Sequence, residues 1–293
     1  MFRFEKITLV TSVEEAIKEL SLDPNSTIIA GGSDILIQSR AKKHNTQNLV
    51  SINGIKALEG VVRDDKGTIH IGPLTTFSGI STNEVIRSYL PALGYATSQA
   101  GGPQLRNVGT IGGNICNGIT SADSIPSLLT YNAHLQLIGP SGERFIDLED
   151  FYSGPRKVKK ARTEVLVDII IKKEDYEDYF GGYIKYSQRK AMDIATLGCA
   201  VQVKLSDDKF SINELRLAFG VAGPTPIRCR NAEKIALTGN ISEDLIEAIA
   251  LEAVSETTPR TSWRASKEFR IRLIYELSIR MIKESNARAA GLD

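Results

Sequence analysis

Cysteine is scarce in this sequence, and its placement excludes several kinds of site. Only three cysteines are present, they stand far apart, and no two form a CxxC pair. Zinc sites and iron–sulfur clusters are therefore not indicated, and we expect three reduced thiols. These cysteines are Cys116, Cys199 and Cys229.

Charge of one sign and long apolar runs are also missing. Lys and Arg total 36 against 35 for Asp and Glu, a net charge of +1, so neither nucleic acid nor an anionic membrane is implied as a partner. No window approaches the roughly 20 apolar residues of a membrane span, and Met1 to Lys6 holds no apolar signal core. We expect a cytoplasmic protein. Its 293 residues suit two or three modules.

Acid–base and nucleophilic chemistry lack their usual residues. The three histidines, His44, His70 and His134, are scattered and accompany no cysteine or carboxylate at ligand spacing. A serine nucleophile would need a GxSxG elbow, which is absent. We therefore expect no catalytic residue and no metal site in this chain. That absence favours chemistry done by a bound cofactor, with the protein supplying position and electrostatics.

Glycine, in contrast, is concentrated. Six of the 24 glycines fall within residues 101–118, and glycine is retained where the backbone takes positive φ or approaches another group closely. Two pairs stand out, Gly31–Gly32 after an apolar run and Gly112–Gly113 after Thr110–Ile111. Consecutive amides there can converge on phosphate groups, and two cradles would suit a dinucleotide. Neither pair matches a Walker A loop or GxGxxG, so two structural turns remain an alternative.

Polar side chains surround both pairs. Their hydroxyl, amide and carboxylate groups suit ribose or ribityl hydroxyls. An alternative for Asp34 is a place in the first turn of a helix that Ser33 caps, where its charge complements the helix dipole. The polar residues are Ser33, Asp34, Thr110, Asn114, Asn117, Ser121 and Asp123.

The apolar pattern predicts three modules. The first, residues 1–56, begins a helix at the capping box Ser12–Glu15. It continues as a small βαβ unit. The expected elements of that unit are a strand over 27–30, a helix over 33–41 and a strand over 49–52.

The second module, residues 57–176, shows a hairpin pattern over 61–71 and a helical pattern over 83–100, directly before the glycine-rich segment. Strand-like runs at 134–138, 144–148 and 164–172 predict a mostly antiparallel sheet. The third module, residues 177–293, follows a charged stretch. Its expected elements are strands over 183–189, 195–205 and 212–221 and helices over 243–254 and 266–282.

Four strings carry a family resemblance: IAGGSDIL from Ile29, TIGGN from Thr110, SAD from Ser121, and KYSQRKAMDIA from Lys185. With these in order along nearly the whole chain, the sequence resembles the FAD-binding (medium) subunit of molybdenum hydroxylases. The three-subunit bacterial xanthine dehydrogenases look most similar. The strings GPQLRNVGTIGGNICNGITSADS, LAFGVAGPTPIRC and SWRASKEFR carry that finer likeness.

The resemblance implies an α+β fold: a two-lobed FAD-binding domain of the vanillyl-alcohol-oxidase type, then a C-terminal α+β domain with a small antiparallel sheet and helices. In that family both glycine loops hold the FAD diphosphate through backbone amides. Asp123 matches a carboxylate that binds cofactor hydroxyls, Lys185 a flavin-contacting lysine, and Leu166 an apolar contact near the ring. The loop residues carried over are Ile29, Ala30, Gly31, Gly32, Ser33, Asp34, Ile35 and Leu36, and Gly109, Thr110, Ile111, Gly112, Gly113 and Asn114.

Two positions limit the transfer of roles. Ala100 stands where some relatives place an aromatic ring against the flavin, so the stacking partner must come from elsewhere or be missing. Asp193 falls where relatives place a carboxylate near the flavin edge, where it would influence access of NAD.

The resemblance further implies a role as electron exit. A molybdopterin-binding large subunit would hydroxylate a purine, a 2Fe-2S small subunit would relay electrons, and FAD held here would pass hydride to NAD. Three alternatives remain: the flavin subunit of a sister hydroxylase acting on carbon monoxide, nicotinate or an aryl-CoA; a stand-alone flavin reductase; or a non-enzymatic nucleotide-binding assembly module. For the last, a basic helix face at residues 264–283 would meet an acidic partner or would simply be solvated.

Overall fold

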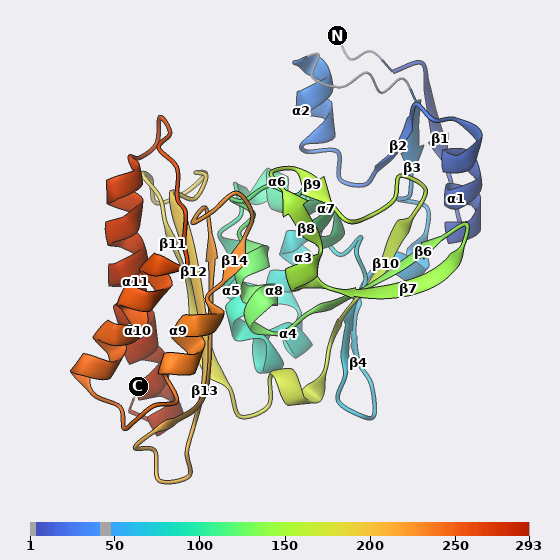
Figure 1. Cartoon of the computed structure of the whole chain (residues 1–293). Helices are drawn as coiled ribbons and strands as arrows, with labels where there is room; N and C mark the ends of the chain where they lie inside the picture. The colour runs from blue at the N-terminus through green and yellow to red at the C-terminus, as the bar shows by residue number, and fades with distance from the viewer. Residues whose placement is uncertain (1–3, 42–47, 293) are drawn as a thin grey trace.

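The computed structural model describes residues 4–41 and 48–292, and its three main sheets follow one another along the chain. The first sheet is three-stranded, the second five-stranded and the third four-stranded. Helices pack between the second and third sheets and outside the third (Figure 1). His44 lies outside the described residues. The division of the chain at residues 56 and 176 stays a prediction.

The N-terminal sheet is parallel throughout, with strand order β1-β3-β2. The predicted βαβ unit is confirmed as β2 (Ser26–Ile29), α2 (Ile35–Arg40) and β3 (Asn48–Ser51). The predicted capping box starts α1 (Val13–Leu22), where the Ser12 hydroxyl accepts a hydrogen bond from the Glu15 amide. Strand β1 (Lys6–Leu9) was not predicted: its four residues do alternate polar and apolar types, but so short a run is a weak signal.

The second sheet has the order β4-β5-β10-β6-β7, and every neighbouring pair is antiparallel, as predicted. Its long central strand pairs with both β5 and β6, so segments far apart in sequence meet in one sheet. A separate two-stranded hairpin, β8 (Tyr152–Gly154) with β9 (Lys157–Val158), stands above it. The five strands are β4 (Val61–Arg63), β5 (Ile69–Ile71), β6 (His134–Gly139), β7 (Gly142–Asp147) and β10 (Val165–Ile171).

The prediction of one helix over 83–100 is wrong, because the structure has two helices there. Pro91 lacks an amide hydrogen and opens a new helix at its first position, so α4 ends at Tyr89. The glycine-rich segment, predicted as a loop, holds two further short helices. The helices of this region are α3 (Phe77–Thr82), α4 (Glu84–Tyr89), α5 (Pro91–Ser98), α6 (Pro103–Val108), α7 (Ile111–Cys116) and α8 (Ser124–Thr130).

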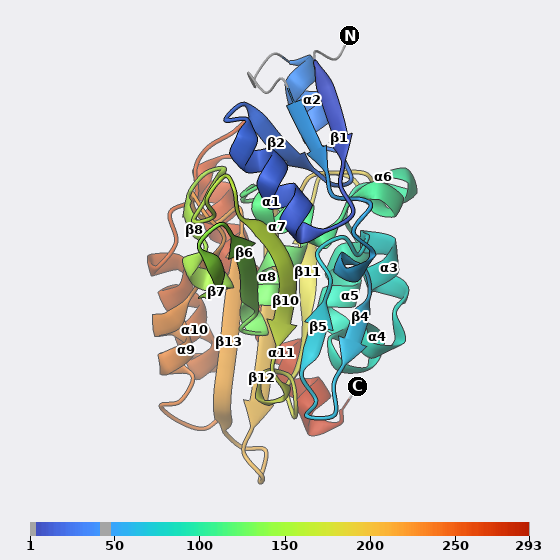
Figure 2. The same cartoon turned by 90° about the vertical axis from the view of Figure 1, so that its right-hand side faces the viewer.

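The C-terminal sheet is an antiparallel meander in the order β11-β12-β13-β14. Helices α9 to α11 cover one face, while α5 and α8 lie against the other face, toward the second sheet (Figures 1 and 2). The three predicted strands and two predicted helices of this module are confirmed. The last helix continues eight residues beyond its predicted C-terminal end. The elements are β11 (Phe180–Tyr186), β12 (Leu197–Leu205), β13 (Ile212–Gly220), β14 (Ile227–Arg228), α9 (Arg230–Ile235), α10 (Glu243–Ser255) and α11 (Lys267–Ala290).

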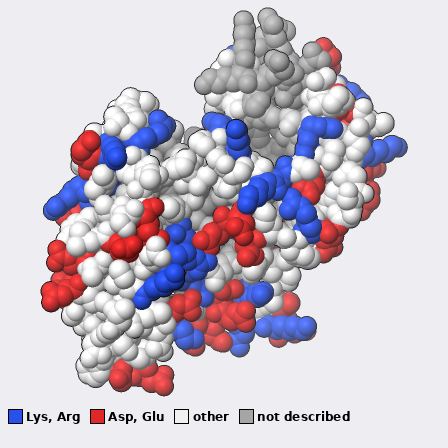
Figure 3. Space-filling view, viewed as in Figure 1, with Lys and Arg blue, Asp and Glu red and all other residues white. Residues whose placement is uncertain are grey.

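The basic face proposed for residues 264–283 is not a continuous cationic surface. Arg270 is buried and donates to backbone carbonyls, including that of Thr196 at 3.2 Å. Lys283 pairs with Glu243 from α10. On the face drawn in Figure 3, acidic side chains lie close to many of the basic ones. Among residues 4–41 and 48–292, no helix is long and apolar enough to cross a membrane.

Candidate functional site

A cavity of about 400 Å³ lies where the first sheet meets the glycine-rich segment. Both predicted glycine loops line it, together with Leu166 from β10. Two segments separated by more than seventy residues are thus brought to one site. The predicted residues that line this cavity are Ile29, Ala30, Gly31, Gly32, Ser33, Asp34, Ile35, Gly109, Thr110, Gly112, Gly113, Asn114 and Leu166.

The first loop presents unused backbone donors. Gly32 has φ of +71°, a conformation that favours glycine. A Cβ on Gly31 would lie 1.8 Å from the Val108 carbonyl oxygen, so this glycine allows the two loops to touch. Within the described part of the chain, the four amides from Gly31 to Asp34 donate no hydrogen bond. Consecutive free amides beside a cavity suit an anion.

The second loop is built differently, because its amides are engaged within the protein. The Gly112 amide donates to the Pro73 carbonyl at 2.9 Å, and the Gly113 amide to the Thr110 hydroxyl at 3.2 Å. Thr110 thereby caps α7. A Cβ on Gly112 would lie 2.4 Å from Pro73 Cβ, whereas Gly113 is exposed toward the cavity. Gly112 allows the loop to pack closely against Pro73, and Gly113 leaves room in the cavity for a ligand.

Arg156 connects the two loops, although no motif in the sequence marks it. Its Nη1 lies 3.2 Å from Asp34 Oδ2 and donates to Asn117 Oδ1 at 3.2 Å. Its backbone is left-handed, with φ of +57°, and its amide donates to the Gly118 carbonyl at 2.9 Å. Lys160 and Arg162 add two further cations to the cavity lining. This charge complements a diphosphate.

Asp34 does not play the capping role considered as an alternative. Helix α2 begins at Ile35, and Asp34 is itself its N-cap residue without a capping side-chain hydrogen bond. The Ser33-capped helix is therefore wrong. The Asp34 carboxylate instead contacts Arg156 and the side-chain amide of Gln38.

Asp123 and Lys185 form a buried ion pair, with Lys185 Nζ 2.8 Å from Asp123 Oδ2. Their side chains are 9% and 6% exposed. The Tyr183 hydroxyl donates to Asp123 Oδ1 at 2.8 Å, and Lys185 also donates to the Gln99 carbonyl at 2.9 Å. Burial raises the pKa of Asp123, and Lys185 opposes that shift. The pair joins α8 to strand β11.

Lys185 faces a second cavity, of about 470 Å³, rather than the first. Gly101 and Asp193 also line it, so Lys185 and Asp193 do share one site. Burial raises the pKa of Asp193, but hydrogen bonds from the Ile194 and Arg189 amides outweigh it and lower that pKa. Ala100 is buried and lines neither cavity.

Two more predicted residues lie outside the first cavity. Ile111 is fully buried in the core of the second module, and Leu36 packs beside Gly32. Pro73, Leu74 and Phe77 line the cavity but were not predicted, since the turn that carries them has no motif of its own. Their apolar surface gives a base or ring system a place to pack.

Among the residues that the structure describes, His70, His134 and the three cysteines form no catalytic cluster. His70 and His134 each contact a carboxylate on a neighbouring strand, Asp168 at 2.6 Å and Asp147 at 2.5 Å. Burial raises the pKa of the Cys116 thiol, which lines the first cavity. Within residues 4–41 and 48–292, no three His, Cys, Asp or Glu side chains gather as a metal site.

These features fit a dinucleotide. Free amides and three cations suit a diphosphate, Ser33, Asn114 and Asn117 suit hydroxyl groups, and the apolar floor suits a planar ring. A family profile described as "FAD binding domain in molybdopterin dehydrogenase" matches residues 2–172. Another, described as "CO dehydrogenase flavoprotein C-terminal domain", matches residues 182–285. Fold and site together define an FAD-binding flavoprotein.

Individual relatives narrow the class. The chain is 41% identical over 291 residues to the xanthine dehydrogenase FAD-binding subunit of Escherichia coli O157:H7, with 99% of each chain covered. It is 32% identical to the nicotinate dehydrogenase FAD-subunit of Eubacterium barkeri, over 77% of this chain and 76% of the relative. The structure of carbon monoxide dehydrogenase from Hydrogenophaga pseudoflava matches with a TM-score of 0.93 at 26% identity, covering 98% and 99% of the two chains.

The chain belongs to the family of FAD-binding subunits of xanthine dehydrogenase-like molybdenum hydroxylases. The expected fold class, an FAD-binding domain followed by a C-terminal α+β domain, is confirmed.

Proposed function

We propose that this chain is the electron exit of a xanthine dehydrogenase-type enzyme. A molybdopterin-binding large subunit oxidises a purine, a 2Fe-2S small subunit relays the electrons, and this chain delivers them to NAD in the cytoplasm. The observation that carries the proposal is the run of free amides at Gly31–Asp34, facing a cavity that Arg156 also lines. The 41% identity over 99% of the chain supports the purine enzyme among the sister enzymes.

In this proposal FAD, once bound, supplies the two-electron chemistry, and the chain's residues hold it and set its surroundings. The amides from Gly31 to Asp34 donate to the diphosphate, while Arg156 compensates its charge. Gly113 leaves space at the second loop. Because the reacting atom would belong to FAD, no side chain of this chain is needed as a catalytic base.

Asp123 and Lys185 take a different role in this proposal. Their buried ion pair places a fixed cation and a fixed carboxylate beside the second cavity. Charge near a flavin tunes its reduction potential. We assign the pair to the ring end of FAD, with Leu166 as the apolar contact and Asp193 near the entry of NAD.

The test is electron delivery by the assembled enzyme. The chain is combined with its two partner subunits and given xanthine and NAD, and NADH formation is followed. We expect NADH with xanthine and none when this chain is left out. Xanthine oxidation that reduces an artificial dye but no NAD would refute the assignment of NAD as acceptor.

The identity to a nicotinate dehydrogenase subunit favours one second candidate, a sister hydroxylase acting on another substrate. The large subunit binds the substrate in either case, so the two candidates differ in the partner rather than in this chain. Offering nicotinate in the same assay separates them. Turnover of nicotinate without turnover of xanthine would favour the sister enzyme.

A further inference from the structure

Helix α8 begins directly after Asp123 and links the proposed flavin site to the C-terminal domain. All seven of its residues are buried. It lies against β12 and β13 on one side and belongs to the core of the second module on the other (Figure 1). A seven-residue helix is about 10 Å long and moves as one piece.

Two arginines of the C-terminal sheet hold the far end of this helix. Arg216 on β13 donates through Nη1 to the Thr130 carbonyl at 3.2 Å, and Arg228 on β14 donates to the Leu129 carbonyl at 3.2 Å. The two arginines are only 3% and 6% exposed. The last carbonyls of a helix lack hydrogen-bond donors within the helix and carry partial negative charge. The two arginines supply those donors and so anchor the end of the helix.

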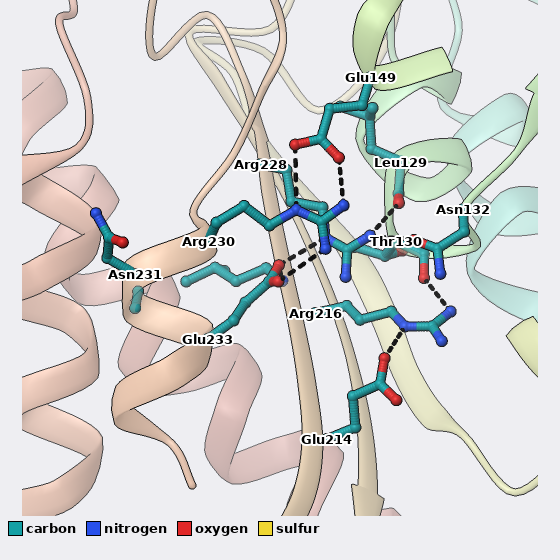
Figure 4. Close-up of polar contacts among 12 residues, drawn as sticks. Leu129, Thr130, Asn132, Glu149, Glu214, Arg216, Arg228, Arg230, Asn231 and Glu233 are labelled. Carbon is teal, nitrogen blue, oxygen red and sulfur yellow. Dashed lines mark hydrogen bonds and ion pairs between the residues drawn. The ribbon is translucent and has the colours of Figure 1, made fainter. Parts of the chain in front are cut away.

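Each guanidinium is fixed on its own domain before it reaches α8. Arg216 donates through Nε to Glu214 at 2.6 Å and lies 4.2 Å over the Tyr179 ring. Arg228 donates through Nε to Glu233 at 2.6 Å. Figure 4 shows both side chains extending from their strands toward the end of α8. Such bonded arginines act as rigid supports rather than flexible surface charges.

The near end of α8 is tied to the same sheet. Asp123 is the residue before the helix, and it contacts Tyr183 and Lys185, both on β11. One helix is therefore held at both ends by one sheet, with the arginines at its C-terminal end and the ion pair at its N-terminal end. A shift at the C-terminal end of α8 displaces Asp123 at its N-terminal end, because the short helix between them is rigid.

We propose that Arg216 and Arg228 are positioning residues for the flavin site, which fix α8 so that Asp123 meets Lys185 in one defined arrangement. The inference rests on the proposed function, since it assumes that this pair lies beside bound FAD. Neither arginine lines the first or second cavity, so neither contacts the cofactor directly.

The chain offers a matched control in Arg230. Like the other two, it joins the domains, through an ion pair with Glu149, and it also lies 3.5 Å from Glu233, but it donates to no carbonyl of α8. A second control is Ile249→Ala, which removes buried apolar volume from the C-terminal core in α10, on the opposite face of the sheet from α8 (Figure 1). It reports what loss of stability alone does to FAD binding.

The experiment measures the affinity of the full-length chain for FAD and the visible circular dichroism of the bound flavin. We expect Arg228→Met to weaken FAD binding by about tenfold, the size of effect seen when a residue that orients direct ligands is lost from a binding site. We also expect the visible dichroism of the flavin to change. Arg230→Met and Ile249→Ala should retain the wild-type dichroism. If Arg228→Met does not fold, Arg228→Lys serves instead: its ammonium cannot bond both Glu233 and Leu129 in the same way, so a smaller change of the same kind is expected.

The outcomes separate the two claims. A wild-type chain that binds no FAD overturns the proposed function and this inference together. FAD binding by the wild type, with affinity and dichroism unchanged in the folded Arg228 variant, overturns the inference alone. Equal changes in the Arg228 variant and in both controls also overturn it, since general destabilisation would then account for the effect.

Discussion

Gly112 and Gly113 are adjacent, yet a side chain would meet different surroundings at each. At Gly112 a Cβ would lie 2.4 Å from Pro73 Cβ and 2.8 Å from the Pro73 carbonyl oxygen, inside the packed protein. At Gly113 it would approach only the Thr110 hydroxyl, at 2.9 Å, and would otherwise face the cavity. The Thr110 side chain can move aside at the cost of its capping bond, whereas backbone cannot. Gly113 therefore allows the site to be blocked without disrupting the fold.

Gly113→Val tests the second loop. The added side chain occupies cavity space, so we expect FAD retention to be lost while the melting temperature falls by no more than about 3 °C. Absorbance of the purified protein and thermal unfolding measure the two quantities. Gly239→Val is the matched control, because a Cβ there meets nothing within 4 Å. Normal FAD content in Gly113→Val would refute the assignment of this loop.

Glu164 gives a prediction for the dependence of stability on pH. Arg144 donates to it twice, at 2.6 and 2.8 Å, and these bonds lower the Glu164 pKa below its ordinary value of 4.5. A lowered folded-state pKa contributes stability that is present above the unfolded pKa and is lost as pH falls through the folded pKa. We expect Arg144→Met to cost about 1 kcal/mol at pH 7, since Arg144 is partly exposed.

Denaturant unfolding of wild type and Arg144→Met between pH 7 and about pH 3 measures this effect. The difference in unfolding free energy should shrink once the pH drops below the ordinary glutamate pKa. A difference that stays constant over the whole range would show that Arg144 acts through packing of its side chain instead.

At the residue scale, the sequence predicted the glycine loops but not the cation between them. The two Gly-Gly pairs carry a local signal, since glycine is costly unless the backbone needs it. Arg156 carries none, because its contacts to Asp34 and Asn117 exist only after three distant segments meet. For the same reason Leu36 and Ile111, predicted by their position in a motif, turned out to lie beside the cavity lining rather than in it.

Helix α7 shows how one element supports the site. Its N-cap, Thr110, is 6% exposed and accepts a hydrogen bond from the Gly113 amide at 3.2 Å. Two further contacts hold this turn. Thr110 forms an isolated antiparallel β-bridge with Thr76, and the Gly112 amide donates to the Pro73 carbonyl. The position of Gly113 thus depends on the cap.

Thr110→Ala removes that cap. We expect a loss of about 1 kcal/mol in unfolding free energy together with weaker FAD binding, and Thr110→Ser should restore both. Ser266→Ala, which removes the equivalent cap of α11, is the matched control: it should lose similar stability and keep the wild-type affinity. Equal loss of affinity in the two alanine variants would mean that stability, not the loop, determines FAD binding.

At the element scale, long periodic segments were predictable and short helices were not. Helix α10 and strands β12 and β13 carry enough alternating or helical pattern to be recognised. Helices α6 and α7 have six residues each, and glycines within α7 argue against helix formation on their own. Pro91 and Pro103 did offer a signal, because proline favours the first turn of a helix.

The whole molecule depends on contacts between its last two sheets. Helices α5 and α8 fill the space between them, and buried arginines cross from the C-terminal sheet to the carbonyls of α8 (Figures 1 and 4). Removing either sheet would expose these charges and helices. We therefore expect the two domains to unfold as one cooperative unit.

Calorimetry checks this cooperativity. A single transition should move to higher temperature when FAD is added, by a stabilisation of about 2.7 kcal/mol when free FAD is 100 times its dissociation constant. Two transitions, of which FAD shifts only one, would show instead that the domains unfold independently.

The most direct measurement is the visible absorption spectrum of the purified full chain, recorded without oxygen before and after NADH is added. The proposed function predicts flavin bands, a released chromophore identified as FAD, and bleaching of the bands by NADH. Flavin that stays oxidised would contradict the role of NAD as acceptor. A chain that binds no flavin even after reconstitution would contradict the central claim that the two glycine loops hold FAD.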